Sequence, residues 1–124
     1  GDQVVEDLPN VTILDHTNNI LDIYRKSKLM LVPSQIESWG RVPIEAACSG
    51  VPSLCSEAPG LVESGIGYQT LPFKDFDKWE LALTQLLHSD YTKACYMAKQ
   101  KAEALWRNSL EEAKEFVRFV EEAR

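Results

Sequence analysis

The 124-residue sequence lacks several features that mark particular classes of protein. No apolar run approaches the roughly 18 residues of a membrane-spanning helix, and no signal-peptide pattern opens the chain. Basic residues are few, with 13 against 19 acidic ones and a formal net charge of -6. Because that charge repels phosphate backbones, nucleic acid is not an expected partner. A cytoplasmic or membrane-peripheral location is expected.

Cysteine and histidine are also scarce. Cys48, Cys55 and Cys95 form no Cys-x-x-Cys pair, and two of them have apolar neighbours, so we expect free, buried thiols. His16 and His88 are expected at the surface. With no cluster of metal-ligating residues in view, the sequence predicts neither a metal nor another cofactor.

The composition that remains is ordinary for a globular protein, with 44% hydrophobic and 26% charged residues. The length suits one compact domain over 1–124 and is too short for two domains of ordinary size. No internal repeat, low-complexity tract or linker interrupts it.

The first half of the chain alternates short apolar runs with short amphipathic stretches. The runs predict strands, and the stretches between them, beginning with Ile20 to Tyr24 and Val42 to Cys48, have helical spacing. Strands separated by helices favour parallel pairing in a layered α/β sheet. The predicted strands are Val11 to Leu14, Lys28 to Val32, Val51 to Cys55 and Tyr68 to Leu71.

The second half is predicted to be helical from Phe76 onward. Tyr91 to Trp106 is predicted to be one helix, and Ser109, with Glu112 three residues later, has the spacing of a capping box that begins another. This last helix carries one apolar stripe. The residues expected to pack in the core are Trp79, Trp106, Phe116 and Phe119.

The segment from Pro33 to Glu45 has the composition of a ligand-binding turn. It leaves the carboxyl end of a predicted parallel strand and enters a helix, and ligands of open α/β sheets bind at such ends. Gly40 allows the backbone to pass close to a ligand, and Pro43 fits a first helical turn. The free amides and dipole of that helix start suit a phosphate or diphosphate.

Two carboxylates frame this turn, Glu37 before Gly40 and Glu45 inside the helix. Each carboxylate can accept hydrogen bonds from a pair of hydroxyl groups, which is the chemistry of diol binding. The alternative is that both are solvated carboxylates, and the phosphate-type turn between them favours binding. Glu63 either assists the nucleotide or is a first-turn glutamate favoured by a helix dipole. Ser34 is a candidate ligand contact or a simple strand terminator.

These residues match a known pattern, which begins with Leu31-Val32-Pro33-Ser34 and has as its specific core two glutamates, Glu37 and Glu45, separated by seven residues. Over about residues 10–107, including Trp106, the chain resembles the group 1 family of retaining GT-B glycosyltransferases, which use nucleotide sugars. The further matching segments are Ala46-Ala47, Gly50-Val51-Pro52 and Gly60-Leu61-Val62-Glu63.

The resemblance implies a role for each site residue. Glu45 would bind the ribose hydroxyls, and Glu37, as the catalytic residue, would hold the donor sugar near the reacting carbon. The amides of Trp39, Gly40 and Arg41 would face the diphosphate and sugar, with Ser34 and Glu63 completing the donor-binding set. The chain departs from the family at Ser38, Trp39 and Arg41, where Gly, Phe and Leu are usual. We hypothesise that Arg41 reaches toward the diphosphate or an anionic acceptor.

The same resemblance implies that the sheet is incomplete. The expected fold is α/β, a partial Rossmann-like parallel sheet flanked by helices with a helical C-terminus, corresponding to the carboxyl-terminal half of a GT-B fold. Two strand-helix units and the amino-terminal acceptor domain would be absent. In the order 3-2-1-4-5-6 the strand at Val11 would be third, and the exposed edges would need cover. A larger natural chain, a rearranged sheet or self-association through the sheet edges is expected, and the last helix could dock on the absent domain.

The predicted function is retaining transfer of a sugar from a nucleoside-diphosphate sugar to a saccharide or lipid-linked acceptor. This chain would be the donor-binding part, inactive by itself. The alternative is a non-catalytic nucleotide-sugar-binding or assembly module, and a third reading is a structural α/β domain.

Overall fold

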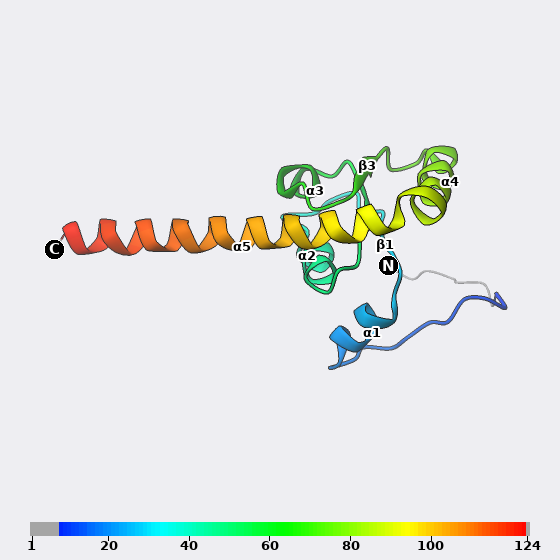
Figure 1. Cartoon of the computed structure of the whole chain (residues 1–124), viewed down its shortest axis with the longest axis horizontal. Coiled ribbons are helices and arrows are strands. Elements are labelled where there is room, and N and C mark those ends of the chain that lie inside the picture. The colour runs from blue at the N-terminus through cyan, green and yellow to red at the C-terminus, as the bar shows by residue number, and fades with distance from the viewer. Residues whose placement is uncertain (1–7, 124) are drawn as a thin grey trace.

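The computed structural model describes residues 8–123 and contains one three-stranded parallel sheet (Figure 1). Its strands are β1 (Met30–Val32), β2 (Ser53–Ser56) and β3 (Gln69–Leu71), which lie side by side in that order. Met30 is level with Ser53, and Leu54 is level with Gln69. The α/β fold is confirmed, although each strand is shorter than the sequence predicts.

Helices connect the strands and continue the chain after β3. Between the strands lie α2 (Arg41–Cys48) and α3 (Pro59–Ser64), and α1 (Ile20–Lys26) precedes the sheet. After β3 come α4 (Phe76–Gln85), the π-helical turn η1 (Leu86–Asp90) and α5 (Tyr91–Glu122). The predicted alternation of helices and strands from Ile20 to Leu71, and the helical character predicted from Phe76 onward, are therefore confirmed.

The core lies on both faces of β2, whose four residues are all buried. Since successive side chains of a strand point to opposite faces, Leu54 packs with Leu71 and Leu86, whereas Cys55 packs with Val32 and Leu61. The sheet is thus covered on both sides, as parallel sheets require.

The predicted strand at Val11 to Leu14 is wrong. These residues form no regular element, and Figure 1 shows the blue segment before α1 running apart from the sheet. Ile13 and Leu14 are 67% and 63% exposed. A strand needs a hydrogen-bonded neighbour, and among residues 8–123 no strand lies beside these residues.

The predicted break between two C-terminal helices is also wrong, because α5 is continuous over 32 residues. No glycine or proline lies between Tyr91 and Glu122 to interrupt it. The Ser109–Glu112 spacing caps a helix only where the chain enters one, and here it lies within a helix that begins at Tyr91.

The aromatic residues of α5 do not join the core. The buried residues of α5 are small and lie in its first half, namely Ala94, Ala98 and Ala102. The second half projects beyond the other elements in Figure 1. Trp106, Phe116 and Phe119 are 67%, 67% and 68% exposed, so their assignment to the core is wrong. The assignment holds for Trp79, which packs against the Leu54 cluster and donates from Nε1 to the Pro72 carbonyl at 2.8 Å.

The three cysteines are free, as predicted, but only Cys55 is fully buried. Cys48, the last residue of α2, is exposed and Cys95 is partly exposed, which corrects the expectation of buried thiols. Across residues 8–123, none of the helices combines the length and apolar character needed to span a membrane.

Candidate functional site

The site is built on the loop that joins β1 to α2. Gly40 ends this loop in the left-handed conformation, with φ of 88°, and serves as the N-cap of α2. A side chain there would be strained by the backbone angle, and its Cβ would lie 2.7 Å from Leu61 Cδ2. The turn into the helix is therefore easiest with a glycine at this point.

A second glycine lets α3 support the same loop. The Gly60 amide donates to the Glu37 carbonyl at 3.0 Å, and a Cβ on Gly60 would lie 2.2 Å from that carbonyl oxygen. Because these atoms belong to two backbones, neither can move aside easily. The first turn of α3 thus fixes the position of Glu37 and Ser38.

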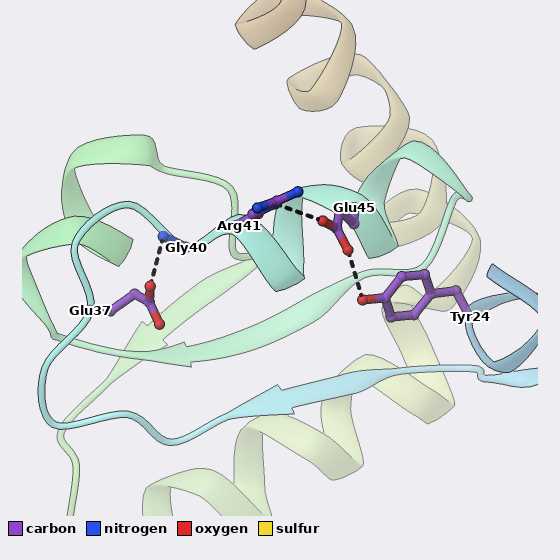
Figure 2. A network of polar contacts seen from close by, with 5 residues as sticks. All are labelled: Tyr24, Glu37, Gly40, Arg41 and Glu45. Carbon is purple, nitrogen blue, oxygen red and sulfur yellow. Dashed lines mark hydrogen bonds and ion pairs between the residues drawn. The ribbon is translucent and has the colours of Figure 1, made fainter. Parts of the chain in front are cut away.

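The Glu37 side chain closes the turn locally. Its Oε1 accepts a hydrogen bond from the Gly40 amide at 3.3 Å, as Figure 2 shows. The amide of Gly40, predicted to face a diphosphate, is therefore engaged by a carboxylate in this structure. Among residues 8–123, no side chain caps the first-turn amides of α2, and Pro43 has no amide hydrogen to cap.

Glu45 lies in α2 with both carboxylate oxygens engaged (Figure 2). Tyr24 Oη of α1 donates to Oε2 at 3.2 Å, and Arg41 Nε, one helical turn earlier, donates to Oε1 at 3.0 Å. Tyr24 is only 2% exposed, whereas the Arg41 side chain is 88% exposed. Burial raises the pKa of the Tyr24 phenol, and the hydrogen bond to Glu45 and its charge raise it further.

A polar pocket of about 290 Å³ opens at the carboxyl edge of the sheet. Ser34, which follows β1, and Ser56, which ends β2, both line it, and Ser56 Oγ donates to the Ser34 carbonyl. This hydrogen bond joins the ends of two strands where parallel α/β sheets bind ligands. The other lining residues are Gln35, Glu57, Ala58 and Phe73.

The two predicted carboxylates are not brought together in one pocket. Glu37 turns to the loop and Glu45 turns to α1, and neither lines the pocket beside Ser34. Figure 2 shows them on either side of the Gly40–Arg41 turn, each with its own polar partner. Both carboxylates thus lie beside the same turn, but each accepts hydrogen bonds from different groups.

The remaining predicted residues lie around the same turn. Trp39 is 44% exposed, and Arg41 is exposed at the start of α2. Glu63 is exposed near the end of the six-residue helix α3, so the first-turn interpretation of Glu63 is wrong. Among residues 8–123, no three His, Cys, Asp or Glu residues form a group that could hold a metal ion.

Tyr24 is not among the site residues predicted from the sequence, where it is only one position of a helix. Its contact with Glu45 joins residues 21 positions apart in the chain. A tyrosine on the buried stripe of a helix does carry a signal, since a buried phenol usually needs a polar partner. The sequence does not indicate which residue that partner is.

The fold and this turn define the chain as a partial Rossmann-like domain of the GT-B type. The family described as "Glycosyl transferases group 1" matches residues 6–104, and the chain belongs to this family. The recognition of the family from the Glu37–Glu45 pattern is thereby confirmed.

Relatives in the family include several named "D-inositol 3-phosphate glycosyltransferase". The protein of Mycobacterium avium is 31% identical over 68% of this chain and 20% of its own length. That of Corynebacterium urealyticum is 30% identical over 80% of this chain and 25% of its own length. The chain therefore spans about a fifth to a quarter of these relatives. The protein of Gordonia bronchialis is 43% identical over a shorter stretch, 41% of this chain and 11% of its own.

Proposed function

We propose that this chain is the donor-binding part of a retaining glycosyltransferase, which transfers a sugar from a nucleoside-diphosphate sugar to an acceptor. The observation that carries the proposal is the Glu37–Gly40–Glu45 turn at the carboxyl edge of the sheet, in a chain that belongs to the group 1 family. In the described part of the chain no side chain caps α2, the helix that follows this turn, so its first amides are available to an anion.

The diphosphate would lie at the start of α2. The amides and the helix dipole there would offset the charge of the diphosphate. Arg41 would leave Glu45 and contact the diphosphate as well, because exposed ion pairs of this spacing are weak. Stabilising charge on the leaving diphosphate is the main contribution that such a site makes to transfer. No metal or other cofactor is part of the proposal.

The sugar and the nucleoside would lie on either side of the diphosphate. Glu45 would accept hydrogen bonds from ribose hydroxyls, and Glu37 would leave the Gly40 amide to meet the donor sugar near its reacting carbon. Release of the Gly40 amide would at the same time provide a further donor for the ligand. Ser34, Trp39 and Glu63 would complete the donor-binding set.

The acceptor is proposed by class alone. A saccharide or a lipid-linked acceptor suits the reaction, and the names of the relatives add a phosphorylated inositol. Transfer also requires a second wall to hold that acceptor, so we expect this chain to bind a donor and to transfer its sugar poorly by itself.

Titration with UDP-, GDP- and ADP-sugars, followed by tryptophan fluorescence, tests donor binding. Trp39 lies on the turn and should report the ligand, and the variant Trp39→Phe should lose the signal while calorimetry still detects binding. Absence of binding to all three donors by calorimetry would contradict the proposal and leave a structural α/β domain.

The alternative is a non-catalytic nucleotide-sugar-binding or assembly module, which would also bind a donor. Sugar transfer by the complete natural protein that contains this chain separates the two. Glu37→Gln should abolish most of that transfer, whereas Glu80→Gln, on an exposed position of α4, should leave it unchanged. Equal activity of Glu37→Gln and the unmodified protein would favour the module.

A further inference from the structure

The Glu45 carboxylate accepts hydrogen bonds from one buried side chain and one side chain that is exposed to solvent. The phenol of Tyr24 reaches Oε2 from the interior, and the guanidinium of Arg41 reaches Oε1 from the solvent side. Tyr24 packs with Ala46 and Val51 in one buried cluster, so its ring has little freedom to move. The Arg41 contact is an exposed pair of the kind that solvent and ligands readily replace.

We propose that Tyr24 is a positioning residue for donor binding, whose hydroxyl fixes the Glu45 carboxylate so that Oε1 is presented to the ligand. This inference rests on the proposed function, since it assumes that Glu45 binds ribose hydroxyls. A bound nucleotide exchanges with Arg41 at Oε1, while Tyr24 stays on Oε2. The carboxylate is thereby oriented before the ligand arrives, which lowers the entropy lost on binding.

The contact is well placed to act in this way, because it couples two elements that flank the site. α1 precedes the sheet and α2 carries the turn, and the Tyr24–Glu45 hydrogen bond links their side chains across 21 positions of sequence. The packing of Tyr24 in its buried cluster does not need the phenolic oxygen, since the ring packs through its carbon atoms. Tyr24→Phe therefore removes the positioning hydrogen bond and keeps the packing.

The test is calorimetric titration of the chain with UDP, GDP and ADP. Tyr24→Phe should weaken the affinity for the nucleotide that binds by about tenfold, because the Glu45 carboxylate must then be ordered as the ligand binds. The matched control is Tyr91→Phe, which removes a hydroxyl that donates to the Lys28 carbonyl at 3.0 Å. That control should leave the affinity unchanged.

A double-mutant cycle separates positioning from a general structural effect. In a Glu45→Ala background, Tyr24→Phe should cause no further loss of affinity, because Tyr24 acts through Glu45. The 2′,3′-dideoxy form of the same nucleotide should bind equally to Tyr24→Phe and the unmodified chain. Additive losses, an equal loss with the dideoxy nucleotide, or unchanged affinity in Tyr24→Phe would each overturn the inference.

A measurement without ligand tests the positioning of Glu45 by Tyr24 independently of nucleotide binding. Three-bond couplings in NMR spectra should report a single χ1 rotamer for Glu45, and rotamer averaging in Tyr24→Phe but not in Tyr91→Phe. An unchanged Glu45 rotamer in Tyr24→Phe would overturn the positioning role even if nucleotides bind. If no nucleotide binds the unmodified chain, the proposed function fails, and the positioning role in ligand binding fails with it.

Discussion

At the scale of single residues, glycines determine the shape of the turn. Gly40 supplies the left-handed backbone that starts α2, and Gly60 supplies the space in which α3 meets the loop. A side chain at either position would displace the segment that holds Glu37. The turn is therefore specified by close backbone approach as well as by its carboxylates.

Gly60→Ala tests this close approach. The added methyl group would overlap the Glu37 carbonyl, so we expect the free energy of unfolding to fall by about 1–3 kcal/mol and nucleotide affinity to fall with it. Urea denaturation and calorimetry measure the two effects. Gly65→Ala is the comparison, because no atom lies within 4 Å of that site, although its φ is 62°. Gly65→Ala should destabilise the chain through backbone strain and leave affinity unchanged. A Gly60→Ala variant as stable as the unmodified chain would contradict the packing described here.

The phenol of Tyr24 predicts a pH dependence of stability. Its pKa is raised in the folded chain, so the unfolded chain loses this proton first, and the stabilisation present below about pH 10 is lost as pH rises above that value. The pKa values of Tyr68 and Tyr91 are also raised, mainly by burial, and that of Lys101 is lowered by burial. These groups titrate in both the unmodified chain and Tyr24→Phe. The difference between the two proteins in the pH dependence of stability therefore reports the Tyr24 phenol alone.

Urea denaturation at several pH values above and below 10 should therefore show a steeper loss of stability in the unmodified chain than in Tyr24→Phe. The groups that contact the phenol or its acceptor are Glu45 and Arg41. Parallel pH profiles for the two proteins would contradict a raised Tyr24 pKa.

At the scale of elements, α5 shows where local sequence signals fail. Helical spacing correctly predicted that residues beyond Phe76 form helices, because periodicity reflects local geometry. The same spacing placed Phe116 in the core, where the structure exposes it. An apolar stripe indicates which face of a helix avoids water, but whether another element covers that face depends on the rest of the molecule.

The exposed half of α5 predicts that its removal is tolerated. The free energy of unfolding of a chain that ends at Arg107 should lie within about 1 kcal/mol of that of the full chain. The removed residues 108–123 are exposed and contribute little burial. Ala98→Leu, a change in the buried half, should cost about 1–3 kcal/mol through overpacking. Thermal unfolding followed by circular dichroism compares them. A loss in the shortened chain as large as that of Ala98→Leu would show that the second half of α5 packs on the domain.

At the scale of the whole molecule, the sheet was predictable only where the sequence contains both partners of each strand. The strands near Met30, Ser53 and Gln69 pair with one another, and all three were predicted. The run at Val11 has the same apolar character, but it pairs with no strand in the part of the chain that the structure describes. The family pattern likewise predicted the turn and its glutamates, whereas their separate engagement by Gly40 and Tyr24 depends on tertiary contacts that no local pattern encodes.

The central claim is that a nucleoside diphosphate binds at the turn between β1 and α2. The most direct test is to follow the backbone amide resonances of the chain by NMR while UDP, GDP or ADP is added. The account predicts that the largest shifts occur at Trp39 to Val42 and at Glu45, with residues 108–123 of α5 unchanged. Saturable shifts confined to other parts of the chain, or no shifts with any of the three nucleotides, would contradict it.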